Sequence, residues 1–544
     1  MSRKIYFGGP ILTSDDEHRT AAAVVTENGR ITDVIYDEST DIAALFPDAE
    51  KHDLQGATLT AGFIDGHSHF ISGIFEDRML NANTSPLGES DSVEQLIASL
   101  KKQLEDPRFD GEDYLYARGY DESIYPDHRL PTRLDLDTVT SRPLALTHIS
   151  GHNTVFNSAA LKAAGVDGSY IPPVDGDAGR LPDGSLSGIF YENAVNDVRP
   201  KRRHNAGKDI REGIERGLLK YVSEGVTTAQ DGGTGPEMFD IMQSLADSGK
   251  LTIDIVSYLI GENTSERLAN AENHRYHGHY RAAGRKIFLD GSPQAKTAWL
   301  SKPYKKTLAG KGSDYRGSGI YTDERLGEII SEAAENGWQI NVHTNGDEAI
   351  EQLIRVVGKV QERYPEWKNS RPVSIHCQTV RSDQLDRMKT SGIIASFFVD
   401  HVFYWGDYHV SEILGEERAS RISPLAEAIA KGVSFSIHQD TPVTKQSPIF
   451  AIHNAVNRTT RSGRILGGEY RITPWEALKA VTINSAYQLF EENEKGSITA
   501  GKLADLVILD GNILTVPPEK IKDIKVIETI KDGETIYLRK QVQP

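Results

Sequence analysis

Alternating helix and strand patterns run through most of this 544-residue chain and constrain its fold more than any other feature. Residues 324–336 have the apolar spacing of a helix, and residues 338–343 follow as a strand that ends in His343. The predicted strands of this kind are residues 62–67, 225–231, 251–260, 286–290, 338–343, 372–376, 393–398 and 433–440. Eight such units over roughly 430 residues predict a (β/α)8 TIM barrel of the α/β class, whose chemistry gathers at the C-terminal ends of the strands.

The two ends of the chain have a different pattern. Both are short and rich in strand signals, and Asn28-Gly29 lies between two apolar runs as in a β-hairpin. Neither end has enough core to fold comfortably alone, so residues 1–62 and 490–544 are predicted to pair into one small β-sandwich domain. The barrel then occupies residues 63–489, and residues 75–215, after its first strand, are read as an inserted subdomain over the barrel mouth.

Composition narrows the functional classes. A formal charge of −17 disfavours nucleic acids and anionic membrane surfaces as partners, and no stretch approaches the roughly 18 apolar residues of a membrane span. The N-terminus lacks the apolar run of a signal peptide, and the single cysteine, Cys377, suits a reducing compartment. We therefore expect a cytoplasmic protein that acts on a small molecule, with Cys377 as a buried apolar residue.

Polar side chains at the predicted strand ends are the candidate metal ligands. His67 and His69 alternate along one strand, so both imidazoles face the same side. A bare His-x-His pair is weak evidence, and any one polar residue at a strand end can simply cap the sheet. The whole set consists of His67, His69, Lys286, His343, His376 and Asp440.

Several separated motifs give the chain a family resemblance. They are GFIDGHSH from Gly62, KIFLDGSPQAKTAWL from Lys286, VHTNGDEAI from Val342, SIHCQTV from Ser374, IHQDTPV from Ile437 and GSITAGKLADLVILD from Gly496. By these motifs the chain resembles the amidohydrolase superfamily over nearly its whole length. Within it, the chain is similar to the branch of YtcJ-like hydrolases (amidohydrolase family 3) that includes N-substituted formamide deformylases.

The resemblance implies a binuclear metal hydrolase. His67 and His69 would bind the more buried of two divalent ions, expected to be Zn²⁺, and His343 and His376 the second. Lys286, carboxylated by CO2, would bridge them, since a free ammonium would repel a cation whereas a carbamate supplies two anionic oxygens. Asp440 would ligate the first ion and act as general acid and base for a metal-bridged hydroxide.

Substrate-side residues are predicted in two places. In the insertion the resemblance implies Asp121, His152 and Glu192, and after the seventh strand the pattern of a histidine among aromatic residues indicates His401, Tyr404 and Trp405. The aromatic cluster at residues 403–405 is expected at a barrel loop, where it would form an apolar wall, although packing against the insertion explains it equally well. His401 would orient the substrate or stabilise a developing oxyanion, and His376 and His401 join Asp440 as the expected catalytic residues.

The preferred reading is an amidohydrolase that cleaves an amide-type C–N bond, other than a peptide bond, in an N-substituted formamide or N-acyl amine. Ester or lactone hydrolysis stays open, because the same hydroxide attacks esters more easily than amides. Deamination of a cyclic amidine is disfavoured, because such deaminases place a Glu where Gly346 stands and would leave Lys286 idle. A non-catalytic regulatory protein on the same scaffold would need no bridging lysine. Relatives are often dimers or larger, so a homodimer is one expected assembly.

Overall fold

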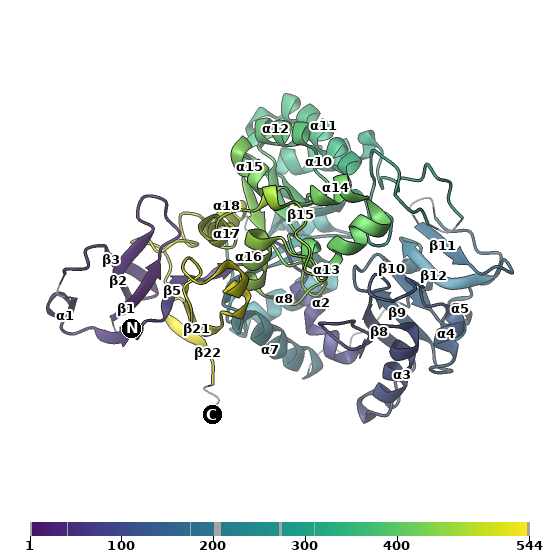
Figure 1. The fold of residues 1–544 in the computed structure, drawn as a ribbon, viewed down its shortest axis with the longest axis horizontal. Helices are drawn as coiled ribbons and strands as arrows, with labels where there is room; N and C mark the ends of the chain where they lie inside the picture. The colour runs from purple at the N-terminus through teal and green to yellow at the C-terminus, as the bar shows by residue number, and fades with distance from the viewer. Residues whose placement is uncertain are drawn as a thin grey trace.

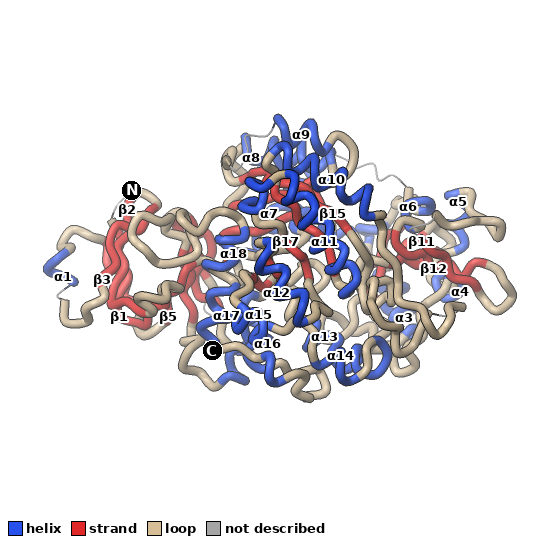
Figure 2. The backbone as a smooth tube through the Cα atoms, turned by 90° about the horizontal axis from the view of Figure 1, so that it is seen from above, coloured by secondary structure: helices blue, strands red, loops and turns tan. Residues whose placement is uncertain are grey.

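The computed structural model describes residues 3–40, 42–173, 176–200, 208–270, 275–308 and 310–540. The strands in these ranges form two sheets of eight strands and one of six. Figure 1 shows the sheet built from both chain ends at one side of the molecule, the parallel sheet with its helices in the middle, and the third sheet at the far side. The view from above in Figure 2 shows the same three parts in a row.

The central sheet is parallel, and its strands follow one another in chain order. They are β6 (Phe63–Ile64), β13 (Val226–Thr234), β14 (Asp254–Leu259), β15 (Tyr280–Phe288), β16 (Gln339–Thr344), β17 (Val373–His376), β18 (Ile394–Phe397) and β19 (Phe435–Ile437). Each overlaps one of the eight predicted strands. The sheet curls until the segments after β6 and β19 meet, where the backbone N–H of His69 donates to the Thr441 carbonyl at 2.7 Å. This is a TIM-barrel-like fold.

Helices follow most of the barrel strands. They are α2 (Phe70–Ile74), α7 (Lys208–Val222), α8 (Pro236–Asp247), α9 (Thr264–Asn270), α10 (Asp323–Asn336), α11 (Asp347–Arg363), α12 (Ser382–Ser391), α13 (His401–Tyr408), α14 (Glu416–Ser420), α15 (Leu425–Lys431), α16 (Pro448–Asn457), α17 (Pro474–Ala480) and α18 (Ile483–Gln488), with short turns η1 (Glu76–Arg78), η3 (Pro365–Ser370), η4 (His409–Ile413), η5 (Gly468–Tyr470) and η6 (Pro518–Asp523). None of the helices in the described part of the chain combines the length and the apolarity that crossing a bilayer requires.

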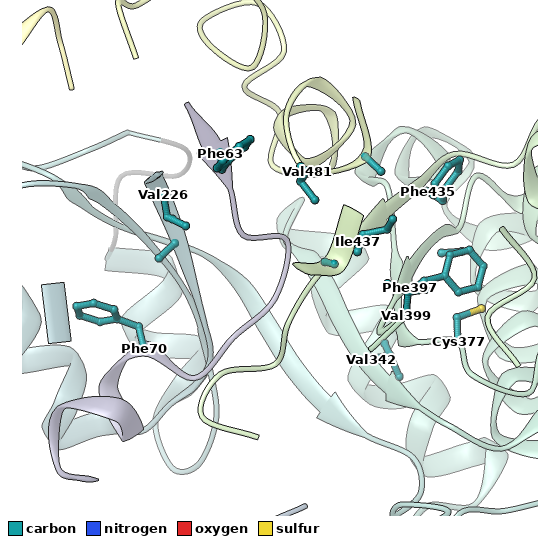
Figure 3. Close-up of a cluster of buried hydrophobic side chains, with 14 of the residues drawn as sticks. Phe63, Phe70, Val226, Val342, Cys377, Phe397, Val399, Phe435, Ile437 and Val481 are labelled. Atoms are coloured by element: carbon teal, nitrogen blue, oxygen red, sulfur yellow. The ribbon is translucent and has the colours of Figure 1, made fainter. Parts of the chain in front are cut away.

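The barrel core lies between the strands and these helices. Phe63, Val226, Val342, Phe397 and Ile437 come from five different strands, and all five are fully buried in one cluster (Figure 3). Each such side chain contributes about 1.5–3 kcal/mol when it leaves water. Cys377 is buried in the same cluster, as predicted, and burial raises the pKa of its thiol to about 12. It is therefore an inert part of the core rather than a reactive thiol.

Residues 473–489 have a helical pattern but are divided into α17 and α18. The first of these helices begins with a capping box formed by Thr473 and Glu476. The break comes from strand β6, since the backbone N–H of Ile64 donates to the Val481 carbonyl at 2.9 Å. A continuous helix would use that carbonyl within itself, so tertiary pairing overrides the helical pattern here.

Strands from both chain ends share one sheet, in the order β22-β21-β20-β5-β1-β2-β3, with β4 beside β1. The bounds are β1 (Lys4–Leu12), β2 (Thr20–Glu27), β3 (Arg30–Ile35), β4 (Glu50–Asp53), β5 (Thr58–Ala61), β20 (Leu506–Leu509), β21 (Val526–Lys531) and β22 (Glu534–Leu538), and α1 spans Ile42–Leu45. The predicted hairpin is confirmed, since Asn28 and Gly29 between β2 and β3 have φ of 51° and 78°. A two-layer sandwich with boundaries at residues 62 and 490 stays a prediction.

The third sheet lies in the chain between β6 and β13 and has the order β11-β12-β10-β9-β8-β7. Its elements are β7 (Leu80–Asn81), α3 (Val93–Gln103), η2 (Pro107–Phe109), β8 (Leu115–Tyr120), α4 (Arg133–Asp137), β9 (Leu144–His148), β10 (Asn153–Phe156), α5 (Ser158–Ala164), β11 (Gly176–Arg180), β12 (Leu186–Glu192) and α6 (Val195–Val198). An inserted subdomain over residues 75–215 stays a prediction, and residues 174–175 and 201–207 of that range lie outside the described residues.

Candidate metal centre

The barrel brings all six predicted ligands to the C-terminal ends of its strands. His67 and His69 follow β6, Lys286 lies in β15, His343 in β16, His376 ends β17, and Asp440 follows β19. His69 is partly exposed, and the other five are buried. Side chains that lie up to 373 positions apart in the chain therefore face one small volume, as the strand alternation predicts.

One half of the cluster is centred on His67. Its Nε2 lies 3.0 Å from Lys286 Nζ and 3.6 Å from Asp440 Oδ1, and His69 Nε2 lies 3.4 Å from the same carboxylate oxygen. Ligand atoms of His67, His376 and Asp440 all lie within 4.8 Å of one another. Asp440 Oδ1 is buried and has no hydrogen-bond partner among the described residues. An acceptor oxygen in that situation fits a cation.

The other half pairs His343 with His376. Their facing nitrogens, Nδ1 and Nε2 respectively, are 3.1 Å apart. His343 Nε2 lies 3.1 Å from the carbonyl oxygen of Gly291, which can only accept, so Nδ1 of this ring is left with a lone pair. Burial lowers the pKa of both histidines well below 6.5, so both rings are neutral. Neutral imidazole nitrogens with their other nitrogen anchored are the usual ligands of divalent metals.

A buried polar shell fixes the His67 ring. His67 Nδ1 donates to Gln230 Oε1 at 2.7 Å, and that amide oxygen also accepts from Asn341 Nδ2 at 2.9 Å. Gln230 in turn donates to the Gly66 carbonyl at 2.7 Å. These contacts direct the free Nε2 toward Lys286 and Asp440. Gly232 makes room for the ring, because a Cβ at this position would lie 1.9 Å from His67 Cε1.

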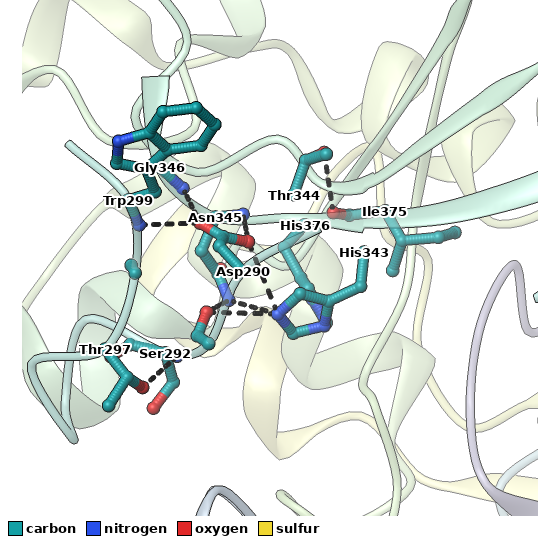
Figure 4. A network of polar contacts seen from close by, with 12 residues as sticks. Asp290, Ser292, Thr297, Trp299, His343, Thr344, Asn345, Gly346, Ile375 and His376 are labelled. Atoms are coloured by element: carbon teal, nitrogen blue, oxygen red, sulfur yellow. Dashed lines mark hydrogen bonds and ion pairs between the residues drawn. The ribbon is translucent and has the colours of Figure 1, made fainter. Parts of the chain in front are cut away.

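Asp290 organises the backbone around His343 (Figure 4). Its carboxylate accepts from the backbone N–H of Asn345 at 3.0 Å, Gly346 at 2.7 Å and Trp299 at 3.0 Å. Burial nevertheless raises the pKa of Asp290 to about 7. The turn that follows His343 is thus held by a carboxylate whose Oδ1 also lies 3.7 Å from His343 Nε2.

Lys286 is buried in this cluster, and its ammonium form is disfavoured there. Burial lowers its pKa to about 7, although the carboxylates of Asp440 and Asp231 act in the opposite direction. A neutral amine has the lone pair that carboxylation by CO2 requires. Four imidazoles, a carboxylate and this amine form a donor set that fits two divalent ions bridged by a carbamate.

His438 is a member of the cluster that the sequence analysis missed. It is fully buried, and its Nε2 lies 3.2 Å from His376 Nδ1, while its Nδ1 contacts Ser396 Oγ at 2.9 Å. The signal was present, because Ser436, His438 and Asp440 alternate along β19 and the following residues and so face the same side. His438 thereby anchors the His376 ring from behind.

A pocket of about 390 Å³ opens onto the ligands. His69, His343, His376 and Asp440 line one side of it. His152 and Glu192, two of the predicted substrate-side residues, also line it, and His152 Nδ1 lies 3.0 Å from Glu192 Oε2. Burial alone would lower the pKa of His152, but the Glu192 carboxylate outweighs it and the pKa is raised above 6.5.

Four predicted substrate-side residues lie outside the lining of this pocket: Asp121, His401, Tyr404 and Trp405. Trp405 Nε1 donates to Asp121 Oδ2 at 2.8 Å, so these two join the third sheet to the barrel. Asp121 also lies in a second buried group with Glu122 and His148, where His148 Nε2 is 3.1 Å from Glu122 Oε2. The substrate roles of all four residues stay predictions.

The segment that carries His401, Tyr404 and Trp405 is helix α13, not the loop that the sequence predicted. The helix begins directly at His401, and its apolar side packs Trp405 against Phe398 and Tyr404. His401 is buried against the Phe398 ring, 4.2 Å between centroids, with its own ring 6.2 Å from that of His376. Burial lowers the pKa of His401 well below 6.5.

Comparisons with known proteins agree with this geometry. A family model described as the amidohydrolase family matches residues 50–537. YtcJ of Bacillus subtilis (strain 168) is 26% identical over 98% of this chain and 99% of its own length. The N-substituted formamide deformylase of Arthrobacter pascens is 25% identical over 97% of each chain. An uncharacterized metal-dependent hydrolase from Pyrococcus horikoshii OT3 superimposes with a TM-score of 0.73, at 23% identity, over 95% of this chain and 99% of that one.

Proposed function

The chain belongs to the amidohydrolase family, and from that premise we propose that it is a metal-dependent hydrolase that cleaves an amide-type C–N bond of a small molecule. N-substituted formamides and other N-acyl amines are the proposed substrates, because a relative that covers almost the whole chain is named a formamide deformylase. The observation that carries the proposal is the buried cluster of ligand-type side chains at the floor of the pocket.

The proposed assignment of ligands follows the two halves of the cluster. His67, His69 and Asp440 would hold one ion, His343 and His376 would hold the other, and carboxylated Lys286 would serve both. When bound, two such ions, with Zn²⁺ expected, supply an acidified water at neutral pH and polarise the scissile carbonyl.

Asp440 is the proposed general acid and base. Burial acts to raise its pKa, but the neighbouring imidazole of His69 outweighs it and the pKa is lowered, so the carboxylate is ionised at neutral pH. Its buried Oδ1 has no hydrogen-bond partner among the described residues, which supports a role in accepting a proton from the attacking water. The same oxygen then returns that proton to the leaving nitrogen.

The deaminase alternative meets a steric obstacle at Gly346. A Cβ at this position would lie 1.9 Å from the Trp299 carbonyl oxygen, so the glutamate that such deaminases carry here has no room. The regulatory alternative does not explain why Lys286 is buried, because an unpaired amine among histidines destabilises the fold and a non-catalytic protein has no use for it. Ester hydrolysis differs from amide hydrolysis only in the leaving group, so the two are compared directly below.

A substrate panel tests the proposal. The metal-loaded protein is assayed with N-formyl and N-acetyl derivatives of one amine, the matched formate and acetate esters, and a heterocyclic amine. We expect amine release from at least one acylated amine, with Asp440→Asn reducing kcat by about 100-fold or more. Ammonia release from the heterocycle alone, or full turnover by Asp440→Asn, would contradict the proposal.

A further inference from the structure

We propose that Arg118 forms a carboxylate-binding site in the metal pocket, so that the substrate is an N-acyl amine that carries a carboxylate beside an apolar group. This inference rests on the proposed function, because it names the substrate class of the same pocket. Arg118 lies in β8 and lines the pocket together with the predicted ligands His69 and Asp440.

The Arg118 guanidinium has few hydrogen-bond and ion-pair partners among the described residues. Its one hydrogen bond within the described part of the chain runs from NH2 to the Ile149 carbonyl at a long 3.3 Å, and no carboxylate oxygen of those residues lies within 4.0 Å. Other arginines of this region are paired, as Arg129 is with Asp135 at 2.8 Å. Burial lowers the pKa of Arg118, although Glu76 and Asp440 act in the opposite direction. Glu76 itself is bonded to Lys220 at 2.5 Å.

A partly buried cation whose hydrogen-bonding fork is left open by the protein favours an anion that completes it. A guanidinium matches a carboxylate with two parallel N–H···O bonds, which makes it the usual recognition group for this anion. Arg118 also lies within electrostatic range of Asp440. A bound carboxylate would therefore sit in the pocket that contains the proposed scissile bond.

The surroundings fit the same class of ligand. Arg199 lines the pocket as a second cation, with its NH2 at 3.2 Å from Thr154 Oγ1. Because the chain carries a net charge of −17, an anionic substrate needs such a local group of cations. Phe288, Ile320 and Val443 also line the pocket and suit an apolar side chain.

The test uses two probes that differ only in the carboxylate, N-formylphenylalanine and N-formyl-2-phenylethylamine. For the metal-loaded parent we expect kcat/KM to favour the carboxylate probe by about 10- to 100-fold. Arg118→Met should remove this preference while changing kcat/KM for the neutral probe by less than about threefold. Arg118→Lys should restore part of the preference. Metal content of each variant is measured alongside.

Arg142→Met is the matched control. Arg142 belongs to the same region but donates to the Phe109 carbonyl at 2.7 Å and does not line the pocket, so the preference should survive. A parent that treats both probes alike, or an Arg118→Met variant that loses both equally, would overturn the inference. If neither probe is cleaved, the proposed function is in question. The role of Arg118 is then tested by calorimetry, in which the parent should bind the carboxylate probe about 10- to 100-fold more tightly than the neutral one and Arg118→Met should not.

Discussion

Lys286 carries the most specific chemistry of any single residue in this chain. Its amine is buried 3.0 Å from His67 Nε2, and burial lowers its pKa to about 7. A positive charge there would repel a metal ion and the protonated forms of the nearby histidines. The lowered pKa makes a large share of the amine neutral at neutral pH, and the neutral amine is the form that reacts with CO2.

The depressed pKa of Lys286 predicts a pH-dependent stability of the metal-free protein in CO2-free buffer. Between pH 7 and 10.5 the unfolded chain binds a proton at Lys286 that the folded chain does not, so the free energy of unfolding should rise with pH. The gain relative to Lys286→Met should reach up to about 1.4 kcal/mol per pH unit. Chemical denaturation of both proteins at several pH values measures this gain. If the free energy of unfolding changed with pH in the same way in both proteins, the lowered pKa of Lys286 would be refuted.

At the residue scale the sequence named six predicted ligands at or near strand termini, and the structure brings their side chains together. It did not identify Gln230 and Asn341, which fix the His67 ring. Amides in a strand resemble any other polar residue until the sheet brings them together across 111 positions. Which nitrogen of His67 is free for a metal follows only from that contact.

At the scale of elements, strand β13 forms the wall against which the His67 ring lies. Gly232→Ala would place a Cβ 1.9 Å from His67 Cε1 and 2.5 Å from its Nδ1, so the ring must move and leave Gln230. We expect bound metal to fall by half or more, and the protein to lose about 1–3 kcal/mol of stability from overpacking.

The neighbouring glycine provides the control for this change. A Cβ at Gly233 would meet His69 Nδ1 at 3.7 Å, an ordinary van der Waals distance. Gly233→Ala should therefore keep its metal. Equal metal content in the two variants, measured by mass spectrometry, would mean that the position of His67 does not depend on β13.

The periodicity of the sequence was enough to place the eight barrel strands, since buried parallel strands between helices have a strong pattern. Periodicity failed to predict the secondary structure at positions where tertiary contacts determine it. The α17–α18 break depends on β6 taking the Val481 carbonyl, and α13 is helical where a loop was predicted. Neither effect can be read from a local window.

At the scale of the whole molecule, buried charges join the barrel to the sheet formed by the chain ends. Asp254 of β14 lies 3.1 Å from Lys531 of β21 and is also bonded to Lys495, and all three are buried. Burial acts to raise the pKa of Asp254, but the two lysines outweigh it and lower the pKa strongly. This carboxylate thus joins strand β21 to barrel strand β14.

Asp254→Asn should destabilise the protein by about 3–5 kcal/mol, because it leaves two buried lysines without their shared partner. The deficit should be present above pH 4 and shrink in more acidic solution, where the parent carboxylate becomes protonated on unfolding. Asp240→Asn, which removes an exposed partner of Arg267, serves as the control and should cost about 1 kcal/mol or less. Equal losses, measured by denaturant unfolding, would contradict this account.

The central claim is that six side chains from distant strands form one binuclear centre bridged by Lys286. The most direct measurement is the metal content per chain, by mass spectrometry, of protein grown with several divalent ions and bicarbonate, compared with Lys286→Ala. The account predicts about two ions in the parent and a clear loss in the variant. No metal in either protein, or full metal in Lys286→Ala, would contradict it.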